Sequence, residues 1–296
     1  MLTRSMIHRI LFFLPYVSIL KSAQCFCPIV ICPGFGNCSK DYETPFDKDE
    51  ELGLVSVLGR RGFDTEKIYT VPIQRLDWMN VARGLFDFRF YSGDAKADGL
   101  GYGWYLKRLR ETVELAHEES GGEKVLLLAH SAGSWLARAA LGGVHRVPHD
   151  ASSCVTRGAL KNTDTLFPGA FLAKEGLQYF SIGGAAVKGS IDTDCNAQNV
   201  AFHGYKLVSG TGNMIGDGIV PLEWTKLEGA KHISLEGVFH SICNIEAKKS
   251  AEIHELNHKW YGSENVVDRW LPEIMKDLEL GTSKIESMDE TTLTFC

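Results

Sequence analysis

Short apolar runs alternate with longer amphipathic stretches along the chain. Residues 28–32 and 124–129 are continuous apolar runs typical of strands buried on both faces, and residues 67–71 alternate as a strand. The other predicted strands cover residues 177–182, 205–209 and 231–235. The predicted helices cover residues 46–58, 104–119, 132–141, 197–203, 222–227 and 266–280. Strands that alternate with helices in this way predict an α/β protein with a mostly parallel sheet.

Three segments lack this periodicity. Residues 74–103 are rich in Gly and aromatic side chains and predict a long loop. Residues 144–176 are polar and irregular, and their length indicates a functional loop such as a lid. Residues 281–296 are polar and predict a loose tail. We expect a single catalytic domain over residues 26–280.

The first 25 residues have the layout of a secretory signal peptide. Arg4 and Arg9 precede an apolar stretch at residues 10–20, and small residues follow up to Cys25. The apolar stretch is shorter than the roughly 20 residues that cross a bilayer, which disfavours a transmembrane anchor. We expect entry into the secretory pathway or export from the cell. A bipartite plastid presequence, with Phe26 after the cleavage site, is the alternative, and a buried first helix is a third reading.

Composition narrows the class of protein. The 296 residues are 44% hydrophobic and 23% charged, an ordinary globular composition that supports a sizeable core. The net charge is −6 and Lys and Arg form no long run, which excludes the basic surface typical of nucleic-acid binders. Eight cysteines permit disulfides in an oxidising compartment, and their pairing stays open, as does the oligomeric state. Their spacing predicts no structural metal site.

The strongest chemical signal is a serine between a predicted buried strand and a predicted helix. Ser131 has Ala129 two residues before it and Gly133 two residues after it. A nucleophile elbow needs small residues at these positions because the backbones crowd where the strand turns into the helix. A serine at this place can also simply cap the helix. The context favours Ser131 as a nucleophile.

A serine hydroxyl needs a base and an orienting acid to become nucleophilic. Asp217 lies in a Gly-rich loop that follows a predicted strand, and His240 follows the last predicted strand, so the order of serine, acid and histidine fits. The alternatives for the acid are Asp192 and Asp194, which come before that strand, and an ordinary turn role for Asp217. His232 competes for the base, but it falls inside a strand.

The reaction also needs two N–H donors for the oxyanion. Ala132 follows the nucleophile, and Phe35 lies in the Gly-rich turn after the first apolar strand, so these two N–H groups are the expected pair. Gly34 and Gly36 let the backbone approach a substrate closely. His130 is expected to point away from the serine and to line the substrate side rather than act as the base. The turn lacks the third Gly of a dinucleotide fingerprint, so no cofactor is expected.

The sequence resembles the α/β-hydrolase superfamily, and within it the lipase- or esterase-like members of plants and algae. The segments that carry the resemblance are residues 30–37, 129–133, 216–224, 235–241 and 260–263. It covers roughly residues 28–280 and implies an α/β-hydrolase fold with helices on both faces of the sheet. By this likeness Ser131, Asp217 and His240 are nucleophile, acid and base. Ala129 replaces the usual Gly, and the two leading strands are missing, which implies a sheet of about six strands.

These signals together predict a serine hydrolase that cleaves carboxylic esters of lipids or other apolar acyl groups through an acyl-enzyme. The alternatives are a non-catalytic binding protein for a small apolar ligand, and a thioesterase or lyase on the same scaffold. The apolar substrate is inferred from a set of aromatic residues that would line an acyl groove or meet a membrane or lipid surface. The alternative is that they belong to the core. These residues are Trp78, Phe86, Phe88, Phe90, Tyr91, Trp104 and Tyr105.

Overall fold

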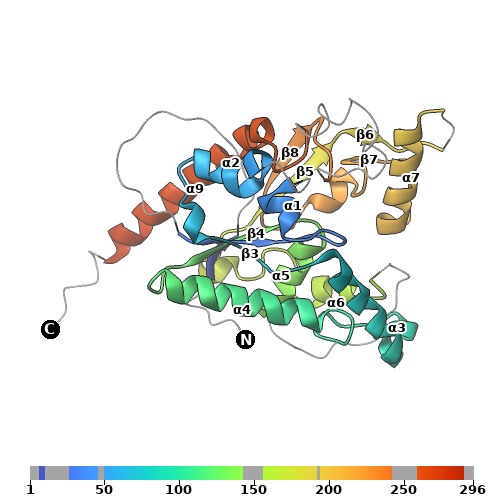
Figure 1. Cartoon of the computed structure of the whole chain (residues 1–296), viewed down its shortest axis with the longest axis horizontal. Coiled ribbons are helices and arrows are strands. Elements are labelled where there is room, and N and C mark those ends of the chain that lie inside the picture. The colour runs from blue at the N-terminus through green and yellow to red at the C-terminus, as the bar shows by residue number, and fades with distance from the viewer. Residues whose placement is uncertain are drawn as a thin grey trace.

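The computed structural model describes residues 7–10, 27–45, 50–142, 156–191, 194–241 and 259–289. The chain is a mixed α/β protein with a small parallel sheet (Figure 1). Four parallel strands form the main sheet in the order β1 (Ile7–Ile10), β4 (Val125–Ala129), β2 (Ile29–Cys32) and β3 (Ile68–Thr70). A parallel pair joins β5 (Phe180–Ala185) to β8 (Lys231–Glu236), and an antiparallel pair joins β6 (Val187–Lys188) to β7 (Ile215–Gly216).

The described strands therefore divide into three sheets instead of the expected single sheet of about six strands. The reason lies at β4, which has β2 on one side and β1 on the other, so neither edge of β4 is open to β5. Strand β1 belongs to the predicted leader, and the remainder of that leader lies outside the described residues.

Helices cover both faces of the main sheet, as expected. The α-helices are α1 (Lys40–Glu43), α2 (Leu54–Arg60), α3 (Phe88–Ser92), α4 (Gly103–Glu119), α5 (Ala132–Gly142), α6 (Ala159–Leu166), α7 (Asn196–Ser209) and α9 (Glu264–Asp289). The 3₁₀ helices are η2 (Glu50–Leu52), η3 (Thr65–Lys67), η4 (Arg75–Phe86), η5 (Ala173–Glu175) and η6 (Leu222–Thr225). Figure 1 shows α4 on one side of the sheet and α2 and α9 on the other.

Alternate residues of the central strands feed two separate cores. Val30 and Leu127 face α4 and α5, where Leu109 and Leu136 are fully buried. Their neighbours Ile31, Leu126 and Leu128 face α2 and α9, and Leu58 and Trp270 fill that second core. Each fully buried aliphatic side chain contributes roughly 1.5–3 kcal/mol. The two cores pack against both faces of β2 and β4. Strand β2 precedes residues 33–37, the expected oxyanion loop, and β4 precedes Ser131, the expected nucleophile.

Several predicted elements need correction. The segment at residues 74–103 is not an open loop, because it forms η4 and α3. The helix and the strand predicted at residues 197–203 and 205–209 are the single helix α7, which buries Ala201 and Tyr205 four residues apart on one face. Helix α9 extends to Asp289, so the first part of the predicted loose tail is helical.

The predicted lid is only partly described. Residues 143–155 lie outside the described residues, while residues 156–176 contain α6 and η5 and are not irregular. Helix α6 packs on α5, and the Arg138 Nη1 donates to the Asp164 carboxylate at 2.8 Å. Among the described helices, none combines the length and the apolar character that crossing a membrane requires.

Candidate active site

The four predicted functional segments each follow a strand. Ser131 comes after β4, the loop that starts at Pro33 comes after β2, Asp217 comes after β7, and His240 comes after β8. Strands β2 and β4 are parallel neighbours, so their carboxyl-end loops lie at the same edge of the main sheet, which is where sites form in α/β proteins. Strands β7 and β8 belong to the two smaller sheets, so the positions of Asp217 and His240 follow from their own contacts.

Ser131 has the backbone of a strained turn. Its φ of 53° puts it in the left-handed region, where among the described residues the only other non-glycine residue is Arg157. This conformation costs a residue with a Cβ roughly 1–2 kcal/mol, and the surrounding structure must hold it in place. The adjacent backbone supplies that support, since the Gly133 N–H donates to the His130 carbonyl at 2.9 Å and the Ser134 N–H to the Ser131 carbonyl at 3.0 Å. The turn thus has the geometry of a nucleophile elbow.

Crowding around this turn explains its small residues. A Cβ on Gly133 would lie 2.3 Å from the Cys32 carbonyl oxygen, so no larger residue fits there without moving β2. A Cβ on Gly34 would lie 2.8 Å from the Ser131 Cβ. Ala129 is 3% exposed and its methyl group belongs to the core, so Ala is accommodated at the small-residue position two before Ser131.

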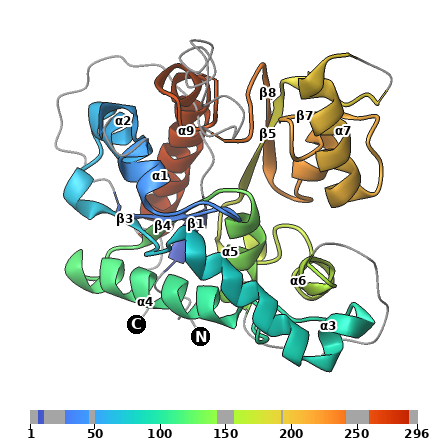
Figure 2. The same cartoon turned by 45° about the vertical axis from the view of Figure 1, so that its right-hand side comes forward.

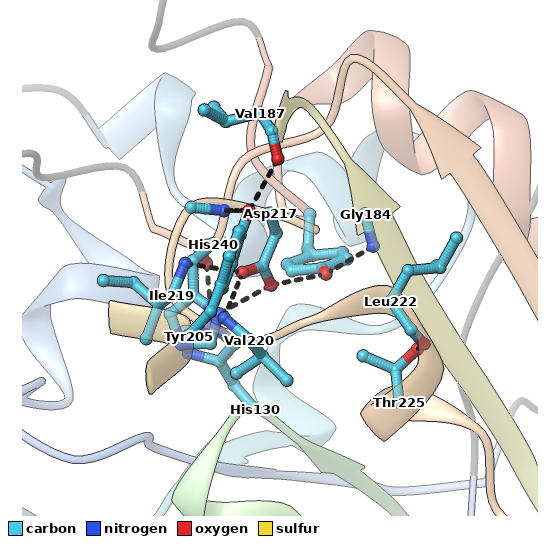
Figure 3. A network of polar contacts seen from close by, with 12 residues as sticks. His130, Gly184, Val187, Tyr205, Asp217, Ile219, Val220, Leu222, Thr225 and His240 are labelled. Carbon is cyan, nitrogen blue, oxygen red and sulfur yellow. Dashed lines mark hydrogen bonds and ion pairs between the residues drawn. The ribbon is translucent and has the colours of Figure 1, made fainter. Parts of the chain in front are cut away.

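Asp217 and His240 form a buried pair. The His240 Nδ1 lies 2.7 Å from the Asp217 Oδ2, and the Asp217 side chain is 2% exposed. The backbone joins the same two residues, because the His240 N–H donates to the Asp217 carbonyl at 3.0 Å. Figure 3 shows the carboxylate at the centre of a group of donors.

The two carboxylate oxygens of Asp217 accept from different partners. Oδ1 accepts from the N–H groups of Ile219 at 3.0 Å and Val220 at 2.7 Å. Oδ2 accepts from His240 and from the Tyr261 hydroxyl at 2.8 Å. Burial by itself would raise the pKa of Asp217, but His240 and the Val220 and Ile219 N–H groups outweigh burial and lower it. Asp217 is therefore ionised at neutral pH and accepts the Nδ1–H of His240, which leaves the His240 Nε2 as the basic nitrogen.

Two tyrosines that sequence reasoning missed hold the Asp217 loop. Tyr261 accepts from the Gly184 N–H at 2.7 Å while it donates to Asp217. Tyr205 donates to the Val187 carbonyl at 2.8 Å and accepts from the Gly218 N–H at 3.0 Å (Figure 3). Burial raises the pKa of both phenols, so both stay protonated. The run at residues 260–263 marked Tyr261 only as part of a resemblance, and no pattern indicated its bond to Asp217.

His130 links the elbow to the histidine loop. Its Nε2 lies 2.8 Å from the His240 carbonyl oxygen and its ring centroid lies 4.8 Å from that of His240. Its Nδ1 lies 2.7 Å from the Tyr42 hydroxyl, and that hydroxyl also accepts from the Gly34 N–H at 3.1 Å. Tyr42 therefore ties the oxyanion loop to the elbow, a role that the sequence did not reveal.

The protonation of His130 follows from these partners. Burial and the neighbouring His240 lower the pKa of His130 to about 3, so the ring is neutral at physiological pH. A carbonyl oxygen can only accept, hence the proton is on Nε2 and Nδ1 accepts from Tyr42. With both nitrogens engaged, His130 has no free basic nitrogen.

Ser131 and His240 share no hydrogen bond in the described part of the chain and are linked through His130. The His130 ring lies against the His240 ring, and the His130 Nε2 is 2.8 Å from the His240 carbonyl oxygen. Serine–histidine bonds are often long in unliganded sites and tighten when substrate binds. The structure therefore brings Asp217 and His240 into direct contact and places Ser131 one residue from a ring that His240 touches.

The oxyanion loop has the turn that its sequence predicts. The Asn37 N–H donates to the Gly34 carbonyl at 3.0 Å, and Gly36 has a φ of 76° in the left-handed region. Gly36 is thus required by the turn itself. Among the described residues, neither the Phe35 N–H nor the Ala132 N–H donates a hydrogen bond, so both are available to an oxyanion.

The alternative site residues lie elsewhere. His232 is in β8, 2.9 Å from the Ser181 hydroxyl, and has no contact with Asp217. Asp194 is exposed, and Asp192 lies outside the described residues. In the same described ranges, no three His, Cys, Asp or Glu residues converge in the way that metal ligands do.

The aromatic residues expected near the substrate divide into three groups. Trp78 at 5% and Tyr105 at 0% exposure belong to the core, so they do not line a groove. Phe86, Phe88 and Tyr91 are exposed by 87%, 73% and 68%. Phe90 and Trp104 are partly buried against the core.

No protein-family model matches the sequence, and the curated proteins contain no match to it.

Proposed function

We propose that the chain is a serine hydrolase of the α/β-hydrolase fold that cleaves carboxylic esters through an acyl-enzyme. The observation that carries this proposal is a left-handed Ser131 whose neighbour His130 contacts His240 of the buried Asp217–His240 pair. A serine that only caps a helix has no use for the left-handed backbone or for a histidine held by an ionised Asp nearby.

In the first half of the reaction, the Ser131 Oγ attacks the ester carbonyl carbon while its proton moves to the His240 Nε2. The carbonyl oxygen becomes an oxyanion, which the Phe35 and Ala132 N–H groups stabilise. When the tetrahedral intermediate collapses, the bond to the alcohol oxygen breaks and His240 gives its proton to the leaving alcohol. Ser131 then carries the acyl group as an ester.

In the second half, water takes the place of the alcohol. The His240 Nε2 accepts a proton from water as the water oxygen attacks the acyl carbon, and the same two N–H groups hold the second oxyanion. The intermediate releases the carboxylic acid, and the proton returns from His240 to the Ser131 Oγ. Loss of one oxyanion donor typically lowers kcat by about 10²- to 10³-fold.

Asp217 supports these proton transfers to and from His240. Its Oδ2 holds the His240 Nδ1–H at 2.7 Å and fixes the tautomer with a basic Nε2. The positive charge that His240 acquires in the transition state lies beside a carboxylate that is already desolvated and held by four donors. The groups around Asp217 therefore need little rearrangement when the proton is transferred.

The rim of the site favours an apolar acyl group. Phe35 is 57% exposed and follows Gly34, where an added Cβ would lie 2.8 Å from the Ser131 Cβ. Ile219 is 42% exposed two residues after Asp217. Apolar side chains that stay exposed beside reactive groups are typical of sites for apolar substrates. Esters and thioesters share this chemistry. Comparing the rates of the two classes identifies the leaving group, and varying the acyl length within each class identifies the preferred chain.

A fluorophosphonate probe tests the proposal directly. The full chain, Ser131→Ala and Ser134→Ala are incubated with the probe, and any adduct is located by mass spectrometry. Ser134 is the matched control because it lies in the same turn and its hydroxyl only donates to the Ala129 carbonyl at 3.0 Å. We expect an adduct on Ser131 in the parent and in Ser134→Ala, and none in Ser131→Ala.

The outcome separates the two classes of function. A folded parent without an adduct contradicts the hydrolase, and it would favour a binding protein that uses the same fold for an apolar ligand. An adduct on a different serine would remove Ser131 from the mechanism.

A further inference from the structure

A stripe of apolar side chains faces solvent along η4. In a 3₁₀ helix the side chains at positions i and i+3 eclipse one another. Leu76, Met79, Ala82 and Leu85 follow this spacing and are all exposed, Leu76 by 74% and Met79 by 71%. All four residues at this three-residue spacing are apolar and exposed, so the stripe covers one whole face of η4.

The apolar surface continues into α3. Phe86, the last residue of η4, is 87% exposed, and Phe88 and Tyr91 on α3 are 73% and 68% exposed. We call Leu76, Met79, Leu85, Phe86, Phe88 and Tyr91 the docking face. Figure 2 shows α3 at the edge of the molecule.

The opposite face of η4 is anchored, so the exposure does not come from a poorly packed segment. Trp78 is 5% exposed and its ring centroid lies 5.5 Å from that of Tyr105 in the core. Gly84 is buried against the ring of Phe90. A rigid element that presents a contiguous apolar face to water marks a binding surface.

The charged side chains of residues 75–92 leave one unpaired cation beside the docking face. The Asp77 carboxylate accepts from Arg108 at 2.5 Å, and Asp87 lies 3.3 Å from Arg89, so both acidic side chains of residues 75–92 are paired. Arg83 lies on η4 beside the stripe and is exposed, and none of the described residues forms an ion pair or hydrogen bond with its side chain. An unpaired cation at an apolar face complements an anionic surface.

Helix η4 contacts the oxyanion loop through residues outside the docking face. The ring of Phe35 lies 5.0 Å from that of Trp78, and the Trp78 Nε1 donates to the Asn37 carbonyl at 2.8 Å. Arg75 at the start of η4 donates to the Gly36 carbonyl at 3.0 Å. The helix that carries the docking face therefore packs against the loop that holds the expected oxyanion donor.

We propose that the docking face binds the surface of an anionic lipid bilayer, and that the site takes its acyl ester from that surface. Only the claim that the site takes its acyl ester from the bilayer rests on the proposed hydrolase function. Exposed Phe and Tyr side chains with an adjacent Arg have the composition of elements that lie in the interface between headgroups and acyl chains. The chain as a whole has a net charge of −6, so an anionic bilayer repels most of its surface and favours contact at a cationic one.

Quenching of a tryptophan at the docking face locates the contact. Phe86→Trp is compared with Leu207→Trp in the full chain, because Leu207 is also exposed, by 62%, but lies on α7, away from α3 in Figures 1 and 2. Vesicles of brominated phosphatidylcholine with phosphatidylglycerol quench a tryptophan that enters the acyl region. We expect added quenching over the parent for Phe86→Trp and none for Leu207→Trp.

Binding variants test the apolar and the cationic parts separately. Phe86→Ser with Phe88→Ser should weaken partition onto the same lipids without bromine by about tenfold or more, whereas Leu207→Ser should leave it unchanged. Arg83→Gln should weaken partition about fivefold on vesicles with phosphatidylglycerol and leave it unchanged on phosphatidylcholine alone.

Three results would overturn the docking surface. The first is equal quenching at both tryptophans or at neither. The second is unchanged partition of the double serine variant. The third is a parent that elutes as a dimer and a double variant that elutes as a monomer, which would assign the face to a second copy of the chain. Fluorophosphonate labelling needs no vesicle, so failure of the hydrolase and failure of docking are read separately.

Discussion

The neutral His130 between the elbow and the histidine loop makes the stability of the fold depend on pH. Its pKa falls from 6.5 to about 3 on folding, because burial and His240 disfavour the imidazolium. Protonation of Nδ1 would also remove the acceptor of the Tyr42 hydroxyl. The perturbation is acidification from pH 7 to pH 5, compared between the parent and His130→Gln, whose amide can both donate and accept but does not titrate.

The sign and size follow from proton linkage. The unfolded chain binds the proton more readily than the folded chain, so stability is complete above pH 6.5 and declines as the pH falls toward about 3. The slope approaches roughly 1.4 kcal/mol per pH unit below pH 6.5, and the partial exposure of the ring reduces it. His130 should therefore cost about 1–2 kcal/mol between pH 7 and pH 5. Asp217 does not contribute here, since its lowered pKa makes its stabilisation disappear only below its usual value of 3.8.

Urea unfolding at pH 7, 6 and 5 measures this effect. The unfolding free energy of the parent should fall by about 1–2 kcal/mol more than that of His130→Gln, because all other titrating groups are common to both. Equal losses in the two chains would refute the reasoning. So would an imidazole NMR signal of His130 that titrates with an ordinary midpoint between pH 6 and pH 7.

Three further predictions concern the site. Asp217→Asn should lower kcat by about 10⁴-fold in an ester assay with unchanged folding, and a near-normal rate would remove Asp217 from the mechanism. Tyr261→Phe should lower the unfolding free energy by about 1.5–3 kcal/mol, because a buried carboxylate loses a donor; an unchanged urea midpoint would contradict that. Gly133→Ala should cost about 3 kcal/mol or more, since its Cβ meets the Cys32 carbonyl at 2.3 Å, whereas Ser134→Ala should cost about 1 kcal/mol; equal melting temperatures would exclude the crowding.

The strands and helices whose apolar residues follow one clear pattern could be predicted from the sequence. Strands β2 and β4 and helices α4 and α5 are found within about a residue of the expected bounds, because two-sided burial and a wide apolar face leave few alternatives. Residues 205–209 were predicted as a strand, since five residues do not separate period 2 from period 3.6. Tyr205 and Ala201, four residues apart, show that the helical period holds there.

The excursion at η4 was missed for a different reason. Its exposed side chains repeat every three residues, a period that fits neither an α-helix nor a strand. The pairing of β1 with β4 joins strands more than 110 residues apart, and no local pattern encodes that contact.

Site residues were predictable where the chemistry fixes the order of residues along the chain. The segments around Ser131, Asp217 and His240 carry local signals of turn and strand end, and the Asp217–His240 contact agrees with the hypothesis. Tyr42 and Tyr261 carry none, because their roles are set by partners 88 and 44 residues away in the sequence. Only the folded chain shows that a buried phenol meets the hydrogen-bonding needs of a histidine or a carboxylate.

The division of the strands into separate sheets has a consequence for inactivation. Ser131 follows a strand of the main sheet, whereas His240 follows β8, which pairs only with β5 in the described chain. Backbone ladders thus fix distances within each sheet, whereas side-chain contacts align one sheet on the other. These contacts include the packing of Leu128 and Ile182, the two imidazole rings and the bond from His130 to the His240 carbonyl. Side-chain packing loosens at lower denaturant than a hydrogen-bonded ladder does. Turnover should therefore disappear at a urea concentration at which far-UV circular dichroism still reports an intact fold.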